Sequence, residues 1–367
     1  MVKRMKVAYM FGSMNRGGAE TIMLDVFRNW QNAPFSFIGI HRKGGAYQED
    51  FYAAGPALYQ LAPMRCGYVR YLIQLRKLLR SENITVVHTQ HWLDCIYAYI
   101  ATIGTKIRLV NTFHGFYSMK GLNGRLCRLS IHMADDVCYV SRYEQEWYQK
   151  QMRIEDKKCH VIYNGIDFSK IDSAKPSLEF ANLPQRIRLA MVGNFVSGRS
   201  QNIIAKSIHV LREKGITNFE FYFIGRRDDK ETWHYDECVK YCEKHKLDNV
   251  YFLGNRGDVP SLLKTIDGFI YSTDHDTFGI AIVEAMVAGL PVVVNDWPVM
   301  KEVCGDVASY FRSKEAEDCA NALEKLLAEL PQRKYEAKSN AEIIRNKYAI
   351  NCYIDTLAKI YENSSNR

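Results

Sequence analysis

The chain has 367 residues, of which 47% are hydrophobic and 25% are charged, as in ordinary globular proteins. This composition excludes a disordered tail protein, a collagen and a small disulfide scaffold, and the length suggests two domains. The net charge of +8 is uneven, because residues 1–180 hold 24 Lys+Arg against 15 Asp+Glu, whereas residues 181–367 hold 25 against 26. The basic half suggests an anionic partner, namely a membrane surface, a phosphorylated substrate or nucleic acid, with solubility alone as the alternative.

We expect neither a membrane span nor a secretory signal. The most apolar stretch, Ile280–Val294, contains Glu284 and Pro291 and is shorter than the ~18–20 residues of a span. The apolar run near the start, Val7–Phe11, is shorter than the ~7–15 residues of a signal core. The ten cysteines are scattered without a Cys-x-x-Cys pair, which is typical of reduced thiols in a cytoplasmic protein.

The first half of the chain alternates short apolar runs with amphipathic segments. The runs predict strands at Lys6–Phe11, Phe35–Ile40, Ile84–Thr89, Arg108–Phe113, Asp136–Val140 and His160–Tyr163. The segments between them predict helices, including Ala19–Trp30, Val69–Arg80 and Leu93–Ile103. Such alternation indicates βαβ units and a parallel sheet.

The alternation stops at Lys175–Arg186, a proline-containing segment that we interpret as an interdomain linker, and then resumes. Further strands are predicted at Ile187–Val192, Phe219–Ile224, Val250–Leu253, Gly268–Tyr271, Pro291–Asn295 and Ser309–Phe311. Helices are predicted at Gln201–Lys214, His234–Lys246, Ile280–Ala288, Ala316–Glu329 and Ala337–Tyr361, with a frayed end at Glu362–Arg367.

We therefore expect an α/β protein with two doubly wound, Rossmann-like domains that face each other across a cleft. The first domain comprises residues 1–180 and the second comprises residues 181–344, followed by a C-terminal helix at about 345–367. Ligands of such sheets bind outside the carboxyl ends of the strands, so the loops that follow the strands are the candidate sites.

Two glycine-rich loops join a strand to a helix, where backbone amides can approach a phosphate. The first, Gly12–Gly18, matches neither Gly-x-Gly-x-x-Gly nor a Walker A loop, so a plain tight turn is its alternative. The second, Gly193–Arg199, places the cation of Arg199 just before a helix, which suits a diphosphate. A solvated arginine is the alternative there.

The most specific segment runs from Asp274 to Glu284, from a strand into an apolar helix in which Glu284 is the only charge. An ionised carboxylate in apolar surroundings needs a partner, for which ligand hydroxyls or a structural Lys or Arg are candidates. Asp276 falls at the helix mouth, where the backbone amides of Phe278, Gly279 and Ile280 are free for a polar ligand.

Metal binding is the weaker interpretation of several residues. Asp274 and Asp276 form an Asp-x-Asp pair, but so short a match often arises by chance, and we expect no metal. His88 and His91 lack an evident third ligand and are interpreted as structural. His114 lies at a strand end before Gly115, which favours a functional role over a structural one.

Together these segments resemble the retaining glycosyltransferases of family 4, the group 1 glycosyltransferases of polysaccharide biosynthesis, which have the two-Rossmann-domain GT-B fold. The resemblance covers nearly the whole chain, from Lys6 to about Tyr361, and implies that the C-terminal helix at about 345–367 packs back on the first domain. It is carried by Gly17–Glu20, Val161–Asp167, Phe252–Gly254, and Ala281–Gly289 followed by Pro291–Val293.

The family's Glu-x₇-Glu motif falls on Asp276 and Glu284. The resemblance implies that Glu284 holds the ribose hydroxyls of a nucleotide-sugar donor and that Asp276, here shorter than the usual Glu, holds the sugar with the following amides. The family's two diphosphate cations fall on Asn194, which departs from the pattern, and on Arg199.

The resemblance also assigns His114 to the reacting carbon and the amides after Gly254, at Asn255 and Arg256, to the nucleobase. The backbone of Gly17 and Gly18 should face the donor phosphates or the acceptor. We count Gly193, Asn194, Arg199 and Phe278–Ile280 with the donor-binding residues, and His114, Arg199, Asp276 and Glu284 as catalytic.

The implied reaction transfers a sugar from a UDP- or GDP-sugar, with retention and without a metal or other cofactor. The implied acceptor is a glycan or a lipid-pyrophosphate-linked glycan. A nucleotide-sugar epimerase of the same fold and a non-catalytic nucleotide-sugar-binding protein remain alternatives. We expect a cytoplasmic enzyme with peripheral contact to an anionic inner membrane face, and no longer a nucleic-acid partner.

Overall fold

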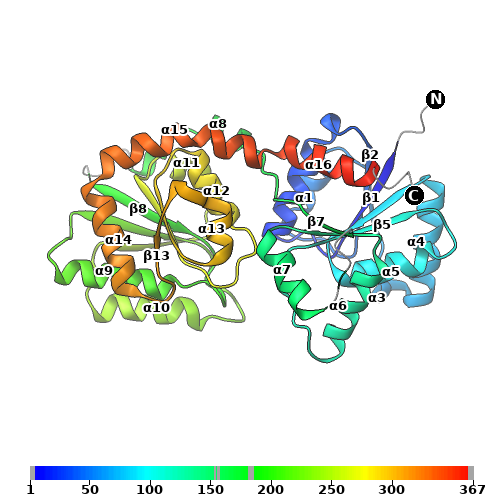
Figure 1. The fold of residues 1–367 in the computed structure, drawn as a ribbon, viewed down its shortest axis with the longest axis horizontal. Coiled ribbons are helices and arrows are strands. Elements are labelled where there is room, and N and C mark those ends of the chain that lie inside the picture. Colours follow the sequence, from blue (N-terminus) through cyan, green and yellow to red (C-terminus); the bar gives the residue numbers. More distant parts are fainter. Residues whose placement is uncertain (1–4, 153, 155–157, 181–185, 363–367) are drawn as a thin grey trace. The chain divides into compact units, whose positions relative to one another are not determined.

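The computed structural model describes residues 5–152, 154, 158–180 and 186–362. Packing divides the chain into two compact units. The first comprises the chain up to Asp167 together with the part from Tyr348 on, and the second runs from Phe168 to Lys347. Figure 1 shows that each unit is a sheet covered by helices.

The first unit contains a sheet of seven parallel strands in the order β3-β2-β1-β4-β5-β6-β7, counted over the described residues. The strands are β1 (Lys6–Phe11), β2 (Ser36–His41), β3 (Leu58–Gln60), β4 (Val86–Thr89), β5 (Arg108–Phe113), β6 (Asp136–Tyr139) and β7 (Cys159–Val161). The predicted strands are confirmed to within one or two residues at each end. The sequence pattern missed β3, because an edge strand of three partly exposed residues has no apolar run.

Helices cover both faces of this sheet. They are α1 (Gly18–Arg28), α2 (Gln48–Ala53), α3 (Pro63–Cys66), α4 (Tyr68–Ser81), α5 (Trp92–Thr102), α6 (Gly121–Met133), α7 (Arg142–Gln151) and α16 (Ile350–Glu362). Side chains alternate along a strand, so Ala8 and Met10 of β1 share a core with α4–α7. Tyr9 points the other way, toward Phe27 of α1 and Tyr361 of α16.

The second unit contains six parallel strands in the order β10-β9-β8-β11-β12-β13, again counted over the described residues. They are β8 (Ile187–Val192), β9 (Phe219–Ile224), β10 (Val250–Gly254), β11 (Gly268–Tyr271), β12 (Val292–Asn295) and β13 (Ala308–Phe311). Its helices are α8 (Ser169–Ser173), α9 (Gln201–Glu213), α10 (Trp233–Lys244), α11 (Val259–Leu263), α12 (Ile280–Val287), α13 (Pro298–Cys304), α14 (Ala316–Ala328) and α15 (Leu330–Tyr348). The strand order reverses between β8 and β11, so their carboxyl ends form the switch point at which ligands bind in such sheets.

The boundary between the units lies at Asp167, before the predicted boundary at 180. Two contacts hold the segment after Asp167 in the second unit: Arg345 makes hydrogen bonds of 2.6 and 2.9 Å to Asp172, and its guanidinium lies over Phe168. Phe180, in the expected linker, is buried against Tyr222. Residues 181–185 of that linker lie outside the described residues.

The chain leaves the first unit and returns to it at one point, where Ile166 pairs with Ala349. The amide of Ile166 donates to the Tyr348 carbonyl at 2.9 Å, and the Ile350 amide donates to the Ile166 carbonyl at 3.0 Å. Residue 165 must be glycine there, because a Cβ would lie 2.3 Å from the Tyr353 Cβ. The close approach seats α16 on the first sheet.

No helix in the described part of the chain is long and apolar enough to span a bilayer. The frayed end that the sequence predicts at Glu362–Arg367 lies outside the described residues after Glu362.

We expect Gly165→Ala to lower the free energy of unfolding by about 1–3 kcal/mol, because the added methyl must push α16 off the first sheet. Urea denaturation followed by circular dichroism measures the change. Gly115→Ala is the matched control, because a Cβ there meets no atom within 4 Å. Equal stability of the two variants would contradict the role of the close approach.

Candidate functional site

In the loop after β8, the guanidinium of Arg199 packs against Gly193. A Cβ on residue 193 would lie 2.3 Å from Nη1 of Arg199, so the guanidinium rests directly on Gly193. Gln201, the first residue of α9, is buried, and its amide nitrogen donates to the Gly193 and Asn194 carbonyls at 3.2 and 3.1 Å. These hydrogen bonds tie the loop to the start of α9, and Arg199 lies beside the amino end of that helix.

Arg199 pairs with Asp276 at the switch point. Its Nη2 lies 3.2 Å from Asp276 Oδ1, and its guanidinium lies over the Tyr271 ring at 5.3 Å. The Tyr271 hydroxyl donates to the other oxygen of Asp276. Burial alone would lower the pKa of Arg199, but Asp276 raises it, so the guanidinium stays charged.

Hydrogen bonds to a backbone carbonyl join the segments that carry Arg199 and Asp276. The Gly198 carbonyl accepts from the Thr273 hydroxyl and from the Asp274 amide, both at 2.9 Å. Residue 198 has a φ of +83°, and a Cβ there would lie 2.3 Å from the His275 Cβ. Trp297 donates its indole N–H to the Asp276 carbonyl at 3.0 Å, which joins the loop after β12 to the same cluster.

The mouth of α12 lies next to this cluster in the chain. Gly279 caps the helix with a φ of +91°, a left-handed conformation that favours glycine. Phe278 is buried, Ile280 begins the helix, and Glu284 lies half-buried in its middle. The first amides of a helix have no acceptor one turn earlier in the helix, so the backbone at Gly279 and Ile280 places N–H groups at the carboxyl end of β11. The Ile282 amide already donates to the Gly279 carbonyl at 3.2 Å.

Asn194 is uncharged, unlike the cation that the family has at this position. It is exposed, and its side-chain oxygen accepts from the backbone amide of Arg226 in the loop after β9, at 3.0 Å. The hydrogen bond links the ends of β8 and β9 and brings the backbone of Arg226 to the position predicted for a diphosphate cation. Only the folded structure reveals this neighbour, because the two residues are far apart in the sequence.

Arg256 holds the loop after β10 in place. Its guanidinium makes hydrogen bonds of 2.7 to 2.8 Å to Asp258 and Glu179, and these two carboxylates raise its pKa. Asn255 is exposed before it, and Gly254 has a φ of +64°. The side chain of Arg256 is therefore engaged by Asp258 of the same loop and by Glu179, so a ligand at this loop would meet the backbone.

In the first unit, His114 follows β5 and is held by Gln90, which follows β4. The Nε2 of His114 lies 2.8 Å from the Gln90 side-chain oxygen, so Nε2 carries the proton. Burial, and then the nearby His91, lower the pKa of His114 to about 4, so the imidazole is neutral near pH 7. The amide nitrogen of Gln90 is buried without a hydrogen-bond partner among the described residues. The sequence pattern predicted His114 as a site residue but did not predict its partner Gln90.

The other two histidines have structural contacts. His88 is fully buried between the Tyr361 and Thr112 hydroxyls, at 2.6 and 2.7 Å, and burial lowers its pKa to about 3. His91 caps α5 by accepting from the Leu93 amide at 3.1 Å. Among the described residues, no group of three His, Cys, Asp or Glu side chains is placed to hold a metal ion.

The first glycine loop has an acidic neighbour. A Cβ on residue 17 would lie 2.5 Å from a carboxylate oxygen of Glu20, whose other oxygen accepts from the Ser13 hydroxyl at 3.2 Å. Gly17 and Gly18 are exposed at the start of α1. A carboxylate thus covers the amino end of α1, where a phosphate would meet a like charge.

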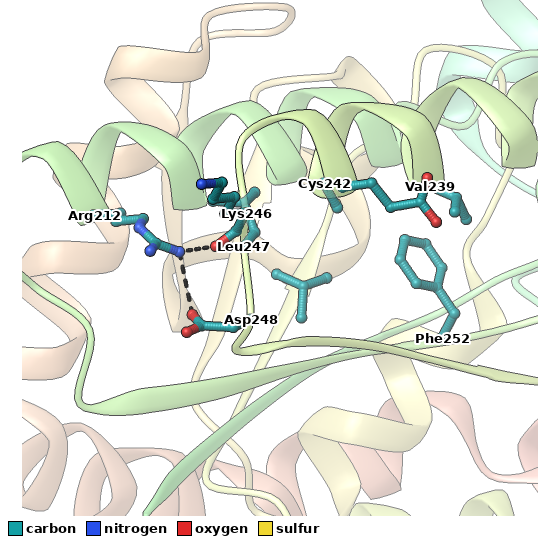
Figure 2. A pocket seen from close by; sticks show the side chains of 9 residues that line it. Arg212, Val239, Cys242, Lys246, Leu247, Asp248 and Phe252 are labelled. Atoms are coloured by element: carbon teal, nitrogen blue, oxygen red, sulfur yellow. Dashed lines mark hydrogen bonds and ion pairs between the residues drawn. The ribbon is translucent and has the colours of Figure 1, made fainter.

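A pocket of about 480 Å³ lies elsewhere in the second unit (Figure 2). Arg212, Lys246 and Asp248 lie at one end of it and Phe252 at the other. Arg212 donates to the Lys246 carbonyl and to Asp248 at the rim. The pocket involves the end of α9 and the start of β10, and none of the predicted site residues lines it.

Comparison with known proteins assigns each half of the chain to a glycosyltransferase family. The family described as "Glycosyltransferase Family 4" matches residues 16–170, and "Glycosyl transferases group 1" matches residues 186–329. A "Capsular polysaccharide biosynthesis glycosyltransferase CapH" from Staphylococcus aureus is 23% identical over 97% of this chain and 98% of its own length.

A second sequence relative and a solved structure are also similar to this chain. The UDP-Gal:alpha-D-GlcNAc-diphosphoundecaprenol alpha-1,3-galactosyltransferase of Escherichia coli is 23% identical over 80% of each chain. The crystal structure of Anabaena Alr3699/HepE in complex with UDP-glucose superposes with a TM-score of 0.84 at 17% identity, over 98% of this chain and 100% of that one. The expected fold of two Rossmann-like domains, GT-B, is confirmed.

We expect Gln90→Glu to raise the pKa of His114 from about 4 toward or above 6.5, because a carboxylate opposite Nε2 stabilises the charged imidazolium. The imidazole would then be protonated at pH values at which the wild-type ring is neutral. Titration of the ¹⁵N-labelled histidine side chains by NMR measures the pKa. Gln90→Met, which adds no charge, is the control; identical His114 titrations in the two variants would contradict the prediction.

Proposed function

The chain belongs to glycosyltransferase family 4, and we propose that it transfers a sugar from a UDP- or GDP-sugar to an acceptor hydroxyl, with retention at the anomeric carbon. The observation that carries the proposal is the Arg199–Asp276 cluster, which lies at the switch point beside the amino ends of α9 and α12. Such a cluster offers a cation and the amino ends of two helices where a nucleotide diphosphate binds.

The leaving diphosphate would be stabilised by Arg199 and the first amides of α9. Nε of Arg199 is buried without a hydrogen-bond partner among the described residues, so it can donate to a phosphate oxygen. Gly193 lets the guanidinium lie flat on the backbone. Charge grows on the diphosphate as the glycosidic bond breaks, and a fixed cation with oriented amides stabilises that charge. We propose that these groups act without a metal.

The rest of the donor would extend to both sides of the switch point. Glu284 would accept from the ribose hydroxyls, and the backbone at Asn255 and Arg256 would contact the nucleobase. Asp276 is already held by Arg199 and Tyr271, so the amides of Phe278, Gly279 and Ile280 would take a larger share of the sugar hydroxyls. These amide contacts would compensate for the side chain of Asp276, which is one methylene shorter than the family's usual Glu.

His114 would act beside the reacting carbon as a neutral imidazole, held in one tautomer by Gln90. The Glu20 carboxylate at Gly17 favours an acceptor hydroxyl at this loop over a donor phosphate, because carboxylate and phosphate repel. In the proposed front-face reaction, an oxygen of the departing diphosphate takes the proton of the acceptor hydroxyl as that hydroxyl attacks the anomeric carbon.

The acceptor would be a glycan or a lipid-pyrophosphate-linked glycan in cell-surface polysaccharide synthesis. The names of two relatives support this class, since one acts in capsular polysaccharide biosynthesis and another on a diphosphoundecaprenol-linked sugar. A lipid-linked acceptor would be met at the inner face of the membrane, to which the basic first half of the chain is suited.

We expect UDP or GDP to bind the wild-type protein and Arg199→Ala to weaken that binding by roughly 10- to 100-fold, because a charge-assisted contact is lost. Isothermal titration calorimetry measures the affinity. Arg212→Ala removes an arginine of the same unit from the pocket in Figure 2 and should bind as the wild type does. Arg199→Lys keeps the charge and tests for misfolding. Unchanged affinity in Arg199→Ala, or no nucleotide binding at all, would overturn the donor site.

We also expect the product to keep the anomeric configuration of the donor and turnover to persist in EDTA. Proton NMR of the anomeric signal during transfer from UDP-glucose, or another donor found to bind, reads out the configuration. An inverted product would exclude the front-face reaction. Loss of turnover in EDTA that is restored by Mg²⁺ or Mn²⁺ would contradict the metal-independent proposal.

A further inference from the structure

The positive charge of the chain is concentrated on a small part of the first unit. Residues 51–134 contain ten Lys+Arg and two Asp+Glu, a net charge of +8 that equals the formal net charge of the whole chain. Both acidic residues are already paired: Asp94 is buried against Arg42, and Glu82 binds Lys6. The segment therefore has basic side chains available to a partner and no unpaired acid of its own.

Exposed apolar side chains gather on the same segment. Among the described residues, nine of the sixteen exposed large hydrophobic side chains belong to residues 64–129. The most exposed are Met64 at 85%, Val69 at 74%, Leu122 at 71%, Tyr68 at 59% and Ile103 at 57%, followed by Ile73 at 50%. Single exposed apolar residues are ordinary, but a concentration of them with basic residues marks an interaction surface.

The helices that carry these residues form one layer. α3 packs on α4, α4 on α5 and α5 on α6, and the buried sides of α4, α5 and α6 share one core with the sheet. Figure 1 shows α3, α4, α5 and α6 together at one side of the first sheet. Their outward sides make a surface that we name the α3–α6 face. Its exposed bases, on the helices or directly before α6, are Arg65, Arg70, Lys77, Arg80, Lys120, Arg125 and Arg128.

The apolar part of the α3–α6 face lies at the edge of the sheet where the site is. α4 and α6 begin after the carboxyl ends of β3 and β5, so Tyr68, Val69 and Leu122 lie at that edge. His114 follows β5 at the same edge. An acceptor that remains anchored in a lipid layer against this face would present its glycan to the site edge of the first unit.

We infer that the α3–α6 face docks on a bilayer that contains anionic lipid. Met64, Val69 and Ile73 would enter the interface while Arg70, Lys77 and Arg80 contact the headgroups. A second copy of the chain is a poor occupant, because two such faces would oppose like charges, and a nucleic acid would leave the apolar side chains unburied. The purpose of this docking, delivery of a lipid-linked acceptor, rests on the proposed function; the docking itself does not.

Co-sedimentation with vesicles tests the inference. We expect the protein to bind phosphatidylcholine vesicles that contain phosphatidylglycerol, and to bind weakly to phosphatidylcholine alone or in high salt. Ile73→Glu should lower the partition coefficient at least tenfold, and Lys77→Gln should lower it about fivefold. Ile343→Glu, on α15 of the second unit at a residue 64% exposed, is the matched control and should bind as the wild type does.

Three outcomes would overturn the docking face: no preference for anionic vesicles, equal effects of Ile73→Glu and Ile343→Glu, or a wild-type dimer in sedimentation velocity that Ile73→Glu dissociates. UDP and GDP binding without vesicles, measured on each variant, separates this inference from the proposed function. Nucleotide binding without vesicle binding removes only the docking face. Vesicle binding without nucleotide binding or sugar transfer removes the proposed function and leaves the docking face.

Discussion

The half-buried ion pair of Arg199 and Asp276 is the constraint on which the site of the second unit depends. A guanidinium that is mostly removed from water needs a counter-charge, and Asp276 supplies it at 3.2 Å. Because Arg199 follows β8 and Asp276 follows β11, the pair joins the two strands at which the sheet order reverses. The same contact that neutralises the cation thus builds the place where a diphosphate would bind, and it leaves one buried nitrogen of Arg199 to meet that ligand.

In the first unit, the imidazoles of His88 and His114 are removed from water and stay neutral. His88 lies between two hydroxyls, one of them from the last helix, and His114 is held by an amide. The end of the chain therefore helps to shape the interior of the first unit, and Gly165 allows α16 to approach closely enough to do so. The positive charge of the first unit lies outside, on the exposed bases of the α3–α6 face.

Much of the architecture could be predicted from local pattern. Strands buried on both faces are continuous apolar runs, so β1, β5, β8, β9 and β11 were found at their observed bounds. The edge strand β3 is too short and too exposed to leave that pattern. The structure places the boundary at Asp167 and not at the predicted 180. The proline-containing segment has the composition of a linker, but Phe180 and Asp172 are held in the second unit by residues distant in the sequence.

The sequence by itself determined the two parallel sheets, the loops that carry the candidate site and the family, because periodicity and motif spacing are local properties of a chain. Only the tertiary structure decided which side chains meet. Arg199 and Asp276 are 77 positions apart, and His114 and Gln90 are 24 apart. No local pattern encodes such pairs, since they exist only once neighbouring strands end at the same edge of a sheet. Tertiary packing also keeps Arg199 charged and His114 neutral, and it decides that the apolar residues on α3–α6 are exposed.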